Sequence, residues 1–80
     1  MGKPTRVTNS IRRLRFEHGE MTQAELARRI DVTRQTVIAI EQARYSPSLE
    51  MAFQIAAVFK VPIDQVFHYD DAGVPKPTEG

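Results

Sequence analysis

The sequence lacks cysteine, and it also lacks any apolar run that approaches the roughly 18 residues needed to span a membrane. Without thiols, disulfide bonds and thiolate zinc sites are excluded, which fits a reducing cytosol. The charged N-terminus has no signal-peptide core, and Arg6 replaces the Ser or Thr that N-myristoylation after Met1-Gly2 requires. We therefore expect a cytoplasmic protein.

What is present is the composition of one small globular domain. Of its 80 residues, 41% are apolar and 26% charged, which suffices for a single small core, and nothing indicates a second domain. The net charge of +1 is unevenly distributed, because residues 1–44 carry +4 and residues 45–80 carry −3. This asymmetry favours an acidic partner such as nucleic acid for the N-terminal half. The alternative is that these arginines only solvate helix surfaces.

Residues 22–41 have the pattern of two short helices joined by a tight turn. Thr22 and Glu25 have the spacing of a capping box, which starts a helix. Asp31 tolerates a left-handed backbone and is expected to end that helix, and Thr33 is expected to cap the next. The apolar faces hold Leu26, Ala27 and Ile30, then Val37 and Ile40. A sharp crossing of two such helices is the helix-turn-helix geometry, whose second helix lies in the DNA major groove.

Helical spacing predicts three further helices around this motif. The first runs over residues 8–18, with Thr8 or Asn9 as its cap, and Gly19 ends it. A fourth helix is capped by Ser48 or by Ser46, and a fifth begins at Pro62. The first helix is placed by the spacing of Val7, Ile11 and Leu14. The fourth is placed by Leu49, Ala52, Phe53, Ala56 and Phe59, which are expected in the core.

Outside residues 7–69 no apolar periodicity is present. Residues 1–6 are expected to be a flexible basic arm, either without function or placed in a DNA minor groove. Residues 70–80 contain two prolines and two glycines, which indicates a disordered tail. At Ala43, a left-handed end of the preceding helix would cost about 1 kcal/mol, unless that helix ends differently.

The motif Met-Thr-Gln-Ala-Glu-Leu-Ala-x-x-x-x-Val-Thr-Arg-Gln-Thr-Val-x-x-Ile-Glu spans residues 21–41. Pro-Ser-Leu follows at 47–49, and Ile-Asp-x-x-Phe at 63–67. Together these motifs resemble the Cro/C1-type (XRE family) transcriptional regulators, over residues 11–67. The resemblance implies an all-α, five-helix, lambda repressor-like domain with a repressor-like or regulator-like function. It also favours a homodimer on a two-fold symmetric DNA site.

Four residues near the start and on the outer face of the second motif helix are the expected base contacts. Arg34 can donate two hydrogen bonds to guanine, Gln35 can pair with adenine, and Ile38 and Ala39 can contact a thymine methyl group. The resemblance supports Arg34, Gln35 and Ala39. Phosphate contacts are expected from helix starts and polar side chains, namely Gln23, Thr33, Thr36, Arg44 and Tyr45.

The resemblance also implies an inward ion pair between Arg15 and Glu41, against the alternative of two unconnected surface charges. For the dimer surface we expect Phe67 and Tyr69, unless these residues cover the domain's own core.

No cofactor or metal site is expected. His18 and His68 lack the partners of a catalytic site, and His68 with two following aspartates is a weak metal motif, so we do not expect an enzyme. The remaining alternative is an antitoxin-like or scaffold module that uses the same fold to bind another protein, because fold does not determine function.

Overall fold

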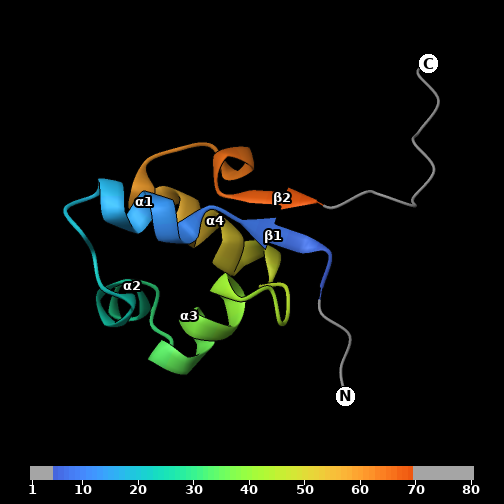
Figure 1. Cartoon of the computed structure of the whole chain (residues 1–80), viewed down its shortest axis with the longest axis horizontal. Coiled ribbons are helices and arrows are strands. Elements are labelled where there is room, and N and C mark those ends of the chain that lie inside the picture. The colour runs from blue at the N-terminus through green and yellow to red at the C-terminus, as the bar shows by residue number, and fades with distance from the viewer. Residues whose placement is uncertain (1–4, 70–80) are drawn as a thin grey trace.

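The computed structural model describes residues 5–69, in which four α-helices and a two-stranded sheet enclose one core (Figure 1). The helices are α1 (Ile11–Glu17), α2 (Gln23–Arg29), α3 (Arg34–Glu41) and α4 (Leu49–Phe59). A single 3-10 turn, Ile63–Gln65, follows α4. Strand β1 (Val7–Asn9) pairs antiparallel with β2 (Phe67–Tyr69), with Val7 opposite Tyr69 and Asn9 opposite Phe67. The two ends of the described chain therefore lie side by side.

The expectation of five helices and an all-α fold is wrong in two places. Residues 7–9 form β1, and α1 begins only at Ile11, whose N–H donates to Asn9 Oδ1 at 3.1 Å. The expected fifth helix is one 3-10 turn, after which the chain enters β2. A pairing between segments about 60 residues apart leaves no trace in local periodicity, and the aromatic and β-branched residues of both segments fit a strand.

The helix ends largely follow the expected residues. Thr22, Thr33 and Ser48 each accept a hydrogen bond from the backbone N–H three residues later, at 3.0 to 3.3 Å. Left-handed residues follow α2 and α3, at Asp31 and Ala43, with φ angles of 61° and 56°. Ala43 is therefore in the strained conformation that the sequence left open.

Glu25 departs from the expected capping box. Its carboxylate binds Arg29 Nε at 2.8 Å and also pairs with Arg28. The hydrogen bond to Arg29, together with the hydrogen bond and charge of Arg28, outweighs the cost of desolvation and holds the pKa of Glu25 below its usual value. The two arginines one turn away thus occupy the carboxylate that was expected to bond the Thr22 N–H.

The core contains residues from every helix, including Ile11, Leu26, Val37, Ile55 and Phe59, all 0 to 1% exposed. Leu49 and Phe53, expected in the core, are 69% and 54% exposed. The reason is that the apolar surface of α4 is wider than the side that the core covers. The covered side holds Ala52, Ile55, Ala56 and Phe59, and the residues at 49 and 53 lie outside it. Helical spacing alone could not distinguish these two faces.

The predicted N-terminal arm and C-terminal tail lie mostly outside the described residues. Residues 1–4 and 70–80 are not described. Thr5, within the expected arm, donates its backbone N–H to Ala43 O at 3.2 Å, which fixes the start of β1 beside the end of α3.

Candidate nucleic-acid interface

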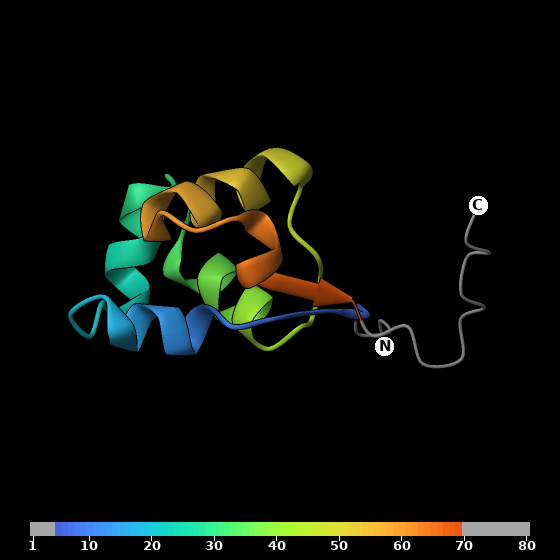
Figure 2. The same ribbon diagram turned by 90° about the horizontal axis from the view of Figure 1, so that it is seen from above.

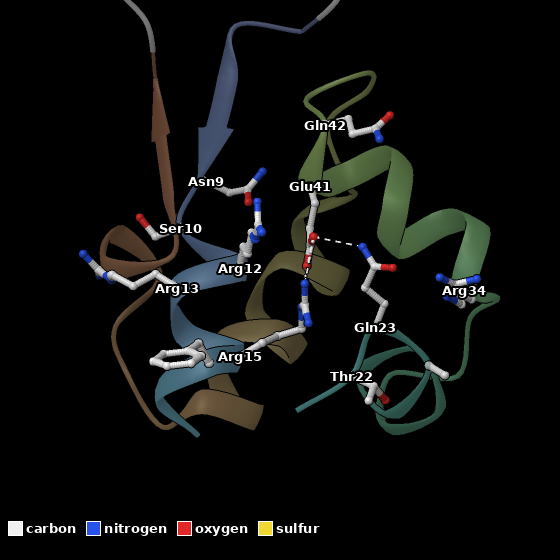
Figure 3. A pocket seen from close by; sticks show the side chains of 12 residues that line it. Asn9, Ser10, Arg12, Arg13, Arg15, Thr22, Gln23, Arg34, Glu41 and Gln42 are labelled. Atoms are coloured by element: carbon white, nitrogen blue, oxygen red, sulfur yellow. Dashed lines mark hydrogen bonds and ion pairs between the residues drawn. The ribbon is translucent and has the colours of Figure 1, made fainter. Parts of the chain in front are cut away.

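An open groove lies between α1 on one side and α2 and α3 on the other (Figure 3). Because α2 and α3 are joined by four residues, the starts of both helices come to the same side of the groove. The residues that line it are Asn9, Ser10, Arg12, Arg13, Arg15, Phe16, Thr22, Gln23, Ala24, Arg34, Glu41 and Gln42.

The groove is held together by Arg15, Glu41 and Gln23, which come from three different helices. Arg15 donates from Nε and Nη2 to the two carboxylate oxygens of Glu41, at 2.6 and 3.2 Å, and from Nη1 to Met21 O at 2.8 Å. Gln23 Nε2 donates to Glu41 Oε1 at 3.1 Å. The Arg15 and Glu41 side chains are only 15% and 9% exposed, so this pair is largely shielded from water.

Asn9 adds a second connection between the sides of the groove. Its side chain donates from Nδ2 to Ile40 O at 2.8 Å while its Oδ1 accepts the N–H of Ile11. The start of α1 is thereby fixed to the last turn of α3. Since both sides are joined by half-buried hydrogen bonds, the starts of α2 and α3 have defined positions relative to α1.

The charge of the groove is positive once internal pairs are accounted for. Glu41 is matched by Arg15, whereas Arg12, Arg13 and Arg34 are exposed and line the same groove. Arg13 has only a long contact to Glu17, 3.7 Å, and Arg12 and Arg34 have no acidic partner within residues 5–69. An anionic ligand would therefore be attracted to this groove.

The residues expected to contact bases lie on the outer part of α3. Arg34 and Gln35 are exposed at its first two positions, and Ile38 and Ala39 are half-buried further along. In Figure 3 Arg34 and Gln23 lie on the same side of the groove.

The residues expected to contact phosphates fall into two groups. Gln23 lines the groove, whereas Arg44 and Tyr45 are exposed in the connection between α3 and α4. Thr33 and Thr36 lie at the start of α3, and their hydroxyl oxygens are 3.1 Å apart. The two hydroxyls share one hydrogen bond, so one hydroxyl hydrogen remains for another acceptor.

Arg12 and Arg13 were not assigned to any site from the sequence. Helical spacing places them on the flank of α1, but only the position of α1 relative to α3, held by hydrogen bonds from Arg15 and Asn9, turns that flank toward the groove. The charge asymmetry between the two halves of the chain was the available signal.

The residues expected at a dimer surface have different environments. Phe67 is half-buried and packs against the core, which is the alternative that the sequence left open for it. Tyr69 is 60% exposed.

Within residues 5–69, no helix is both long and apolar enough to cross a membrane. The same part of the chain contains no group of three side chains suited to hold a metal ion. Asp70 and Asp71 of the weak metal motif lie outside the described residues.

Fold and groove together define a small helix-turn-helix domain with a basic groove beside its second motif helix. A family model described as helix-turn-helix matches residues 11–66, and the chain belongs to this family, in its Cro/C1 (XRE) type.

The chain is similar to several short archaeal proteins. An uncharacterized HTH-type transcriptional regulator of Methanothermobacter thermautotrophicus is 52% identical over 64 residues, covering 79% of this chain and 91% of that protein. A second, from Methanocaldococcus jannaschii, is 46% identical over 63 residues, covering 79% and 94%. The crystal structure of a candidate DNA-binding protein from Bacteroides fragilis has the same fold, with a TM-score of 0.67 and 21% identity, and covers 78% of this chain and 98% of that one.

Proposed function

We propose that the protein is a transcriptional regulator that binds double-stranded DNA in a sequence-specific manner and acts as a repressor. The observation that carries this proposal is the position of Arg34 and Gln35, exposed at the start of α3, on the same side as a groove lined by further arginines. A helix start of this kind enters the major groove, where its first side chains reach base edges. The relatives' description as HTH-type transcriptional regulators supports the same role.

Base recognition is assigned to α3. The guanidinium of Arg34 donates two parallel hydrogen bonds to guanine O6 and N7, and the amide of Gln35 pairs with adenine N6 and N7. Ile38 and Ala39, which have no side-chain donor, contact thymine methyl groups. These four residues carry the sequence preference.

Phosphate contacts position α3 and contribute most of the affinity without reading sequence. The amide nitrogen of Gln23 carries two hydrogens, and since one bonds Glu41, the other is available to a phosphate oxygen. Thr33 and Thr36 offer the remaining hydroxyl hydrogen, and Arg44 and Tyr45 extend the contacts beyond α3. We add Arg12 and Arg13, because they line the groove from the opposite side.

One domain of this size covers little DNA, so two copies on two half-sites about 34 Å apart are expected. The alternative of an antitoxin-like or scaffold module is favoured by one observation, the exposed apolar residues of α4.

The test is selection of bound sequences from a randomised duplex pool, followed by fluorescence-anisotropy titration at two salt concentrations. We expect enrichment of a two-fold symmetric site and a steep decrease of affinity with salt. Absence of enrichment, together with no binding near physiological salt, would reject the proposal in favour of a protein partner.

A further inference from the structure

The outer face of α4 carries a row of exposed apolar side chains that the groove does not use. Leu49 is 69% exposed, Phe53 is 54% exposed, and Ala57 is also exposed. These three residues are four apart, so they lie along one side of the helix. We name them the α4 stripe. A row that includes a half-exposed Phe and a largely exposed Leu on so small a domain indicates a contact surface rather than scattered apolar residues.

The α4 stripe remains accessible when the groove is occupied. Figure 2 shows α4 along one side of the domain and α1 along the other. The residues that line the groove come from β1, α1, α2, α3 and the residues that flank them. The groove lining includes no residue of α4, so a ligand in the groove leaves the α4 stripe exposed.

The charges at the two ends of α4 indicate which ligand fits. Glu50 is exposed in the first turn, and Lys60 is exposed at the residue that follows Phe59. Consider a second α4 that runs antiparallel, with the two-fold axis crossing the helix pair at the level of residue 55. Glu50 of each copy then faces Lys60 of the other. The same register places Phe53 opposite Ala57, a large residue against a small one. A parallel arrangement would instead place equal charges opposite each other.

We propose that the α4 stripe is the surface on which a second copy of this chain docks, in a two-fold symmetric antiparallel pair of α4 helices. Every contact then occurs twice, as symmetry requires. The inference deepens the proposed function and rests on it, because a two-fold symmetric DNA site requires two copies. The surface expected around β2 offers less exposed apolar area. Phe67 packs against the core of its own domain, so only Tyr69 of the two expected residues is exposed.

The size of the surface determines how the dimer behaves. An eleven-residue helix is about 16 Å long, so the interface is at the small end of specific interfaces. The free protein is therefore a weak, reversible dimer. On DNA, two adjacent half-sites raise the effective concentration of one copy beside the other, and the same contact appears as cooperative binding.

The first experiment is sedimentation velocity of the full chain from micromolar to millimolar concentration, without DNA. We expect a monomer–dimer equilibrium whose dissociation constant increases at least about tenfold in Phe53→Glu. Gln54→Glu, which adds the same charge at the next exposed position of α4, is the matched control and has a smaller effect. Because both positions are exposed, we expect both variants to remain folded, and thermal unfolding of each variant checks this.

A charge exchange tests the antiparallel register itself. Glu50→Lys and Lys60→Glu each place like charges opposite each other in a homodimer, so each variant alone dimerises more weakly. An equimolar mixture of the two restores both opposite-charge pairs, and we expect it to regain dimerisation. A mixture no better than its components would overturn the antiparallel register.

Two further outcomes would overturn the proposed surface. One is loss of dimerisation in Tyr69→Glu with an unchanged Phe53→Glu, which would place the dimer at β2. The other is a wild-type protein that stays monomeric at millimolar concentration and binds a two-site duplex with a cooperativity that Phe53→Glu does not change. The α4 stripe would then bind a different protein. Failure of the proposed function is seen separately, on a single half-site duplex, because binding there needs one copy only.

Discussion

The two sides of this domain differ in how their exposed residues are held. On the groove side, Arg15, Glu41, Gln23 and Asn9 connect three helices through hydrogen bonds of 2.6 to 3.2 Å. On the α4 side, Leu49 and Phe53 project from the helix without apolar cover. These four polar side chains are fixed before any ligand binds, whereas the α4 stripe offers apolar area whose burial requires a partner. Under the proposed function, recognition would use the preorganised groove, and assembly would use the apolar face of α4.

Removing one partner of the shielded ion pair is expected to have the largest effect on the groove side. Arg15→Ala or Glu41→Ala leaves the other charge largely shielded from water without its ionic partner, which should lower the free energy of unfolding by about 3 to 5 kcal/mol. Urea denaturation measures this change, and Gln54→Ala on the exposed face of α4 is the control, expected within about 0.5 kcal/mol of wild type. Wild-type stability in both groove variants would show that the pair does not organise the groove.

Next in size is the loss of base recognition. Gln35→Ala should reduce, by about 1 to 3 kcal/mol, the difference in binding free energy between the selected duplex and a duplex altered at one base pair. Competition binding on the two duplexes measures it. Arg44→Ala, which removes a proposed phosphate contact, should weaken both duplexes alike. Equal effects of the two substitutions on random and selected DNA would contradict this division of roles.

The left-handed residue after α3 provides a stabilising substitution. Ala43 has a φ of 56°, so Ala43→Gly should raise the free energy of unfolding by about 1 kcal/mol. In contrast, Ala57→Gly within α4 should lower it by about the same amount. Chemical denaturation of both variants gives the comparison, and a decrease in both would mean that Ala43 is not strained.

A smaller effect is expected from the arginine that the sequence left unassigned. If Arg12 makes the proposed phosphate contact, Arg12→Ala should reduce the slope of log affinity against log salt by about 0.9 on a half-site duplex. Lys60→Ala, on the α4 side, should leave that slope unchanged on the same duplex. A slope unaffected by Arg12→Ala would remove α1 from the DNA interface.

The smallest effect concerns Glu25, whose pKa is lowered by Arg29 and Arg28. A lowered folded-state pKa stabilises the fold at neutral pH, and that contribution is lost as pH falls from the usual glutamate range through the lowered value. Glu25→Gln should therefore flatten the acid side of the stability curve. Thermal unfolding between neutral pH and pH about 3 measures it. An unchanged dependence of stability on acidic pH would show that the ion pairs of Glu25 contribute nothing to stability.

The helix-turn-helix was predictable because its signals are local. Thr22, Thr33 and Asp31 act on backbone groups within one turn, and these caps and the left-handed residue are where the sequence placed them. The start of α3, with Arg34 and Gln35 outward, follows from the cap at Thr33 and from the buried positions of Val37 and Ile40. The ion pair between Arg15 and Glu41, which are 26 residues apart, was predicted from the family resemblance and not from local signals.

The tertiary structure decided what depends on distant neighbours. Pairing of residues 7–9 with 67–69 replaced two predicted helical segments, because strand partners 60 residues apart leave no local pattern. Whether Arg12 faces the groove depended on the position of α1 relative to α3. Likewise, the sequence determined that α4 has a wide apolar surface, but only the position of the core decided that Phe59 is buried while Leu49 and Phe53 are not. Periodicity specifies a helix and its apolar residues, whereas burial is a property of the elements that pack against it.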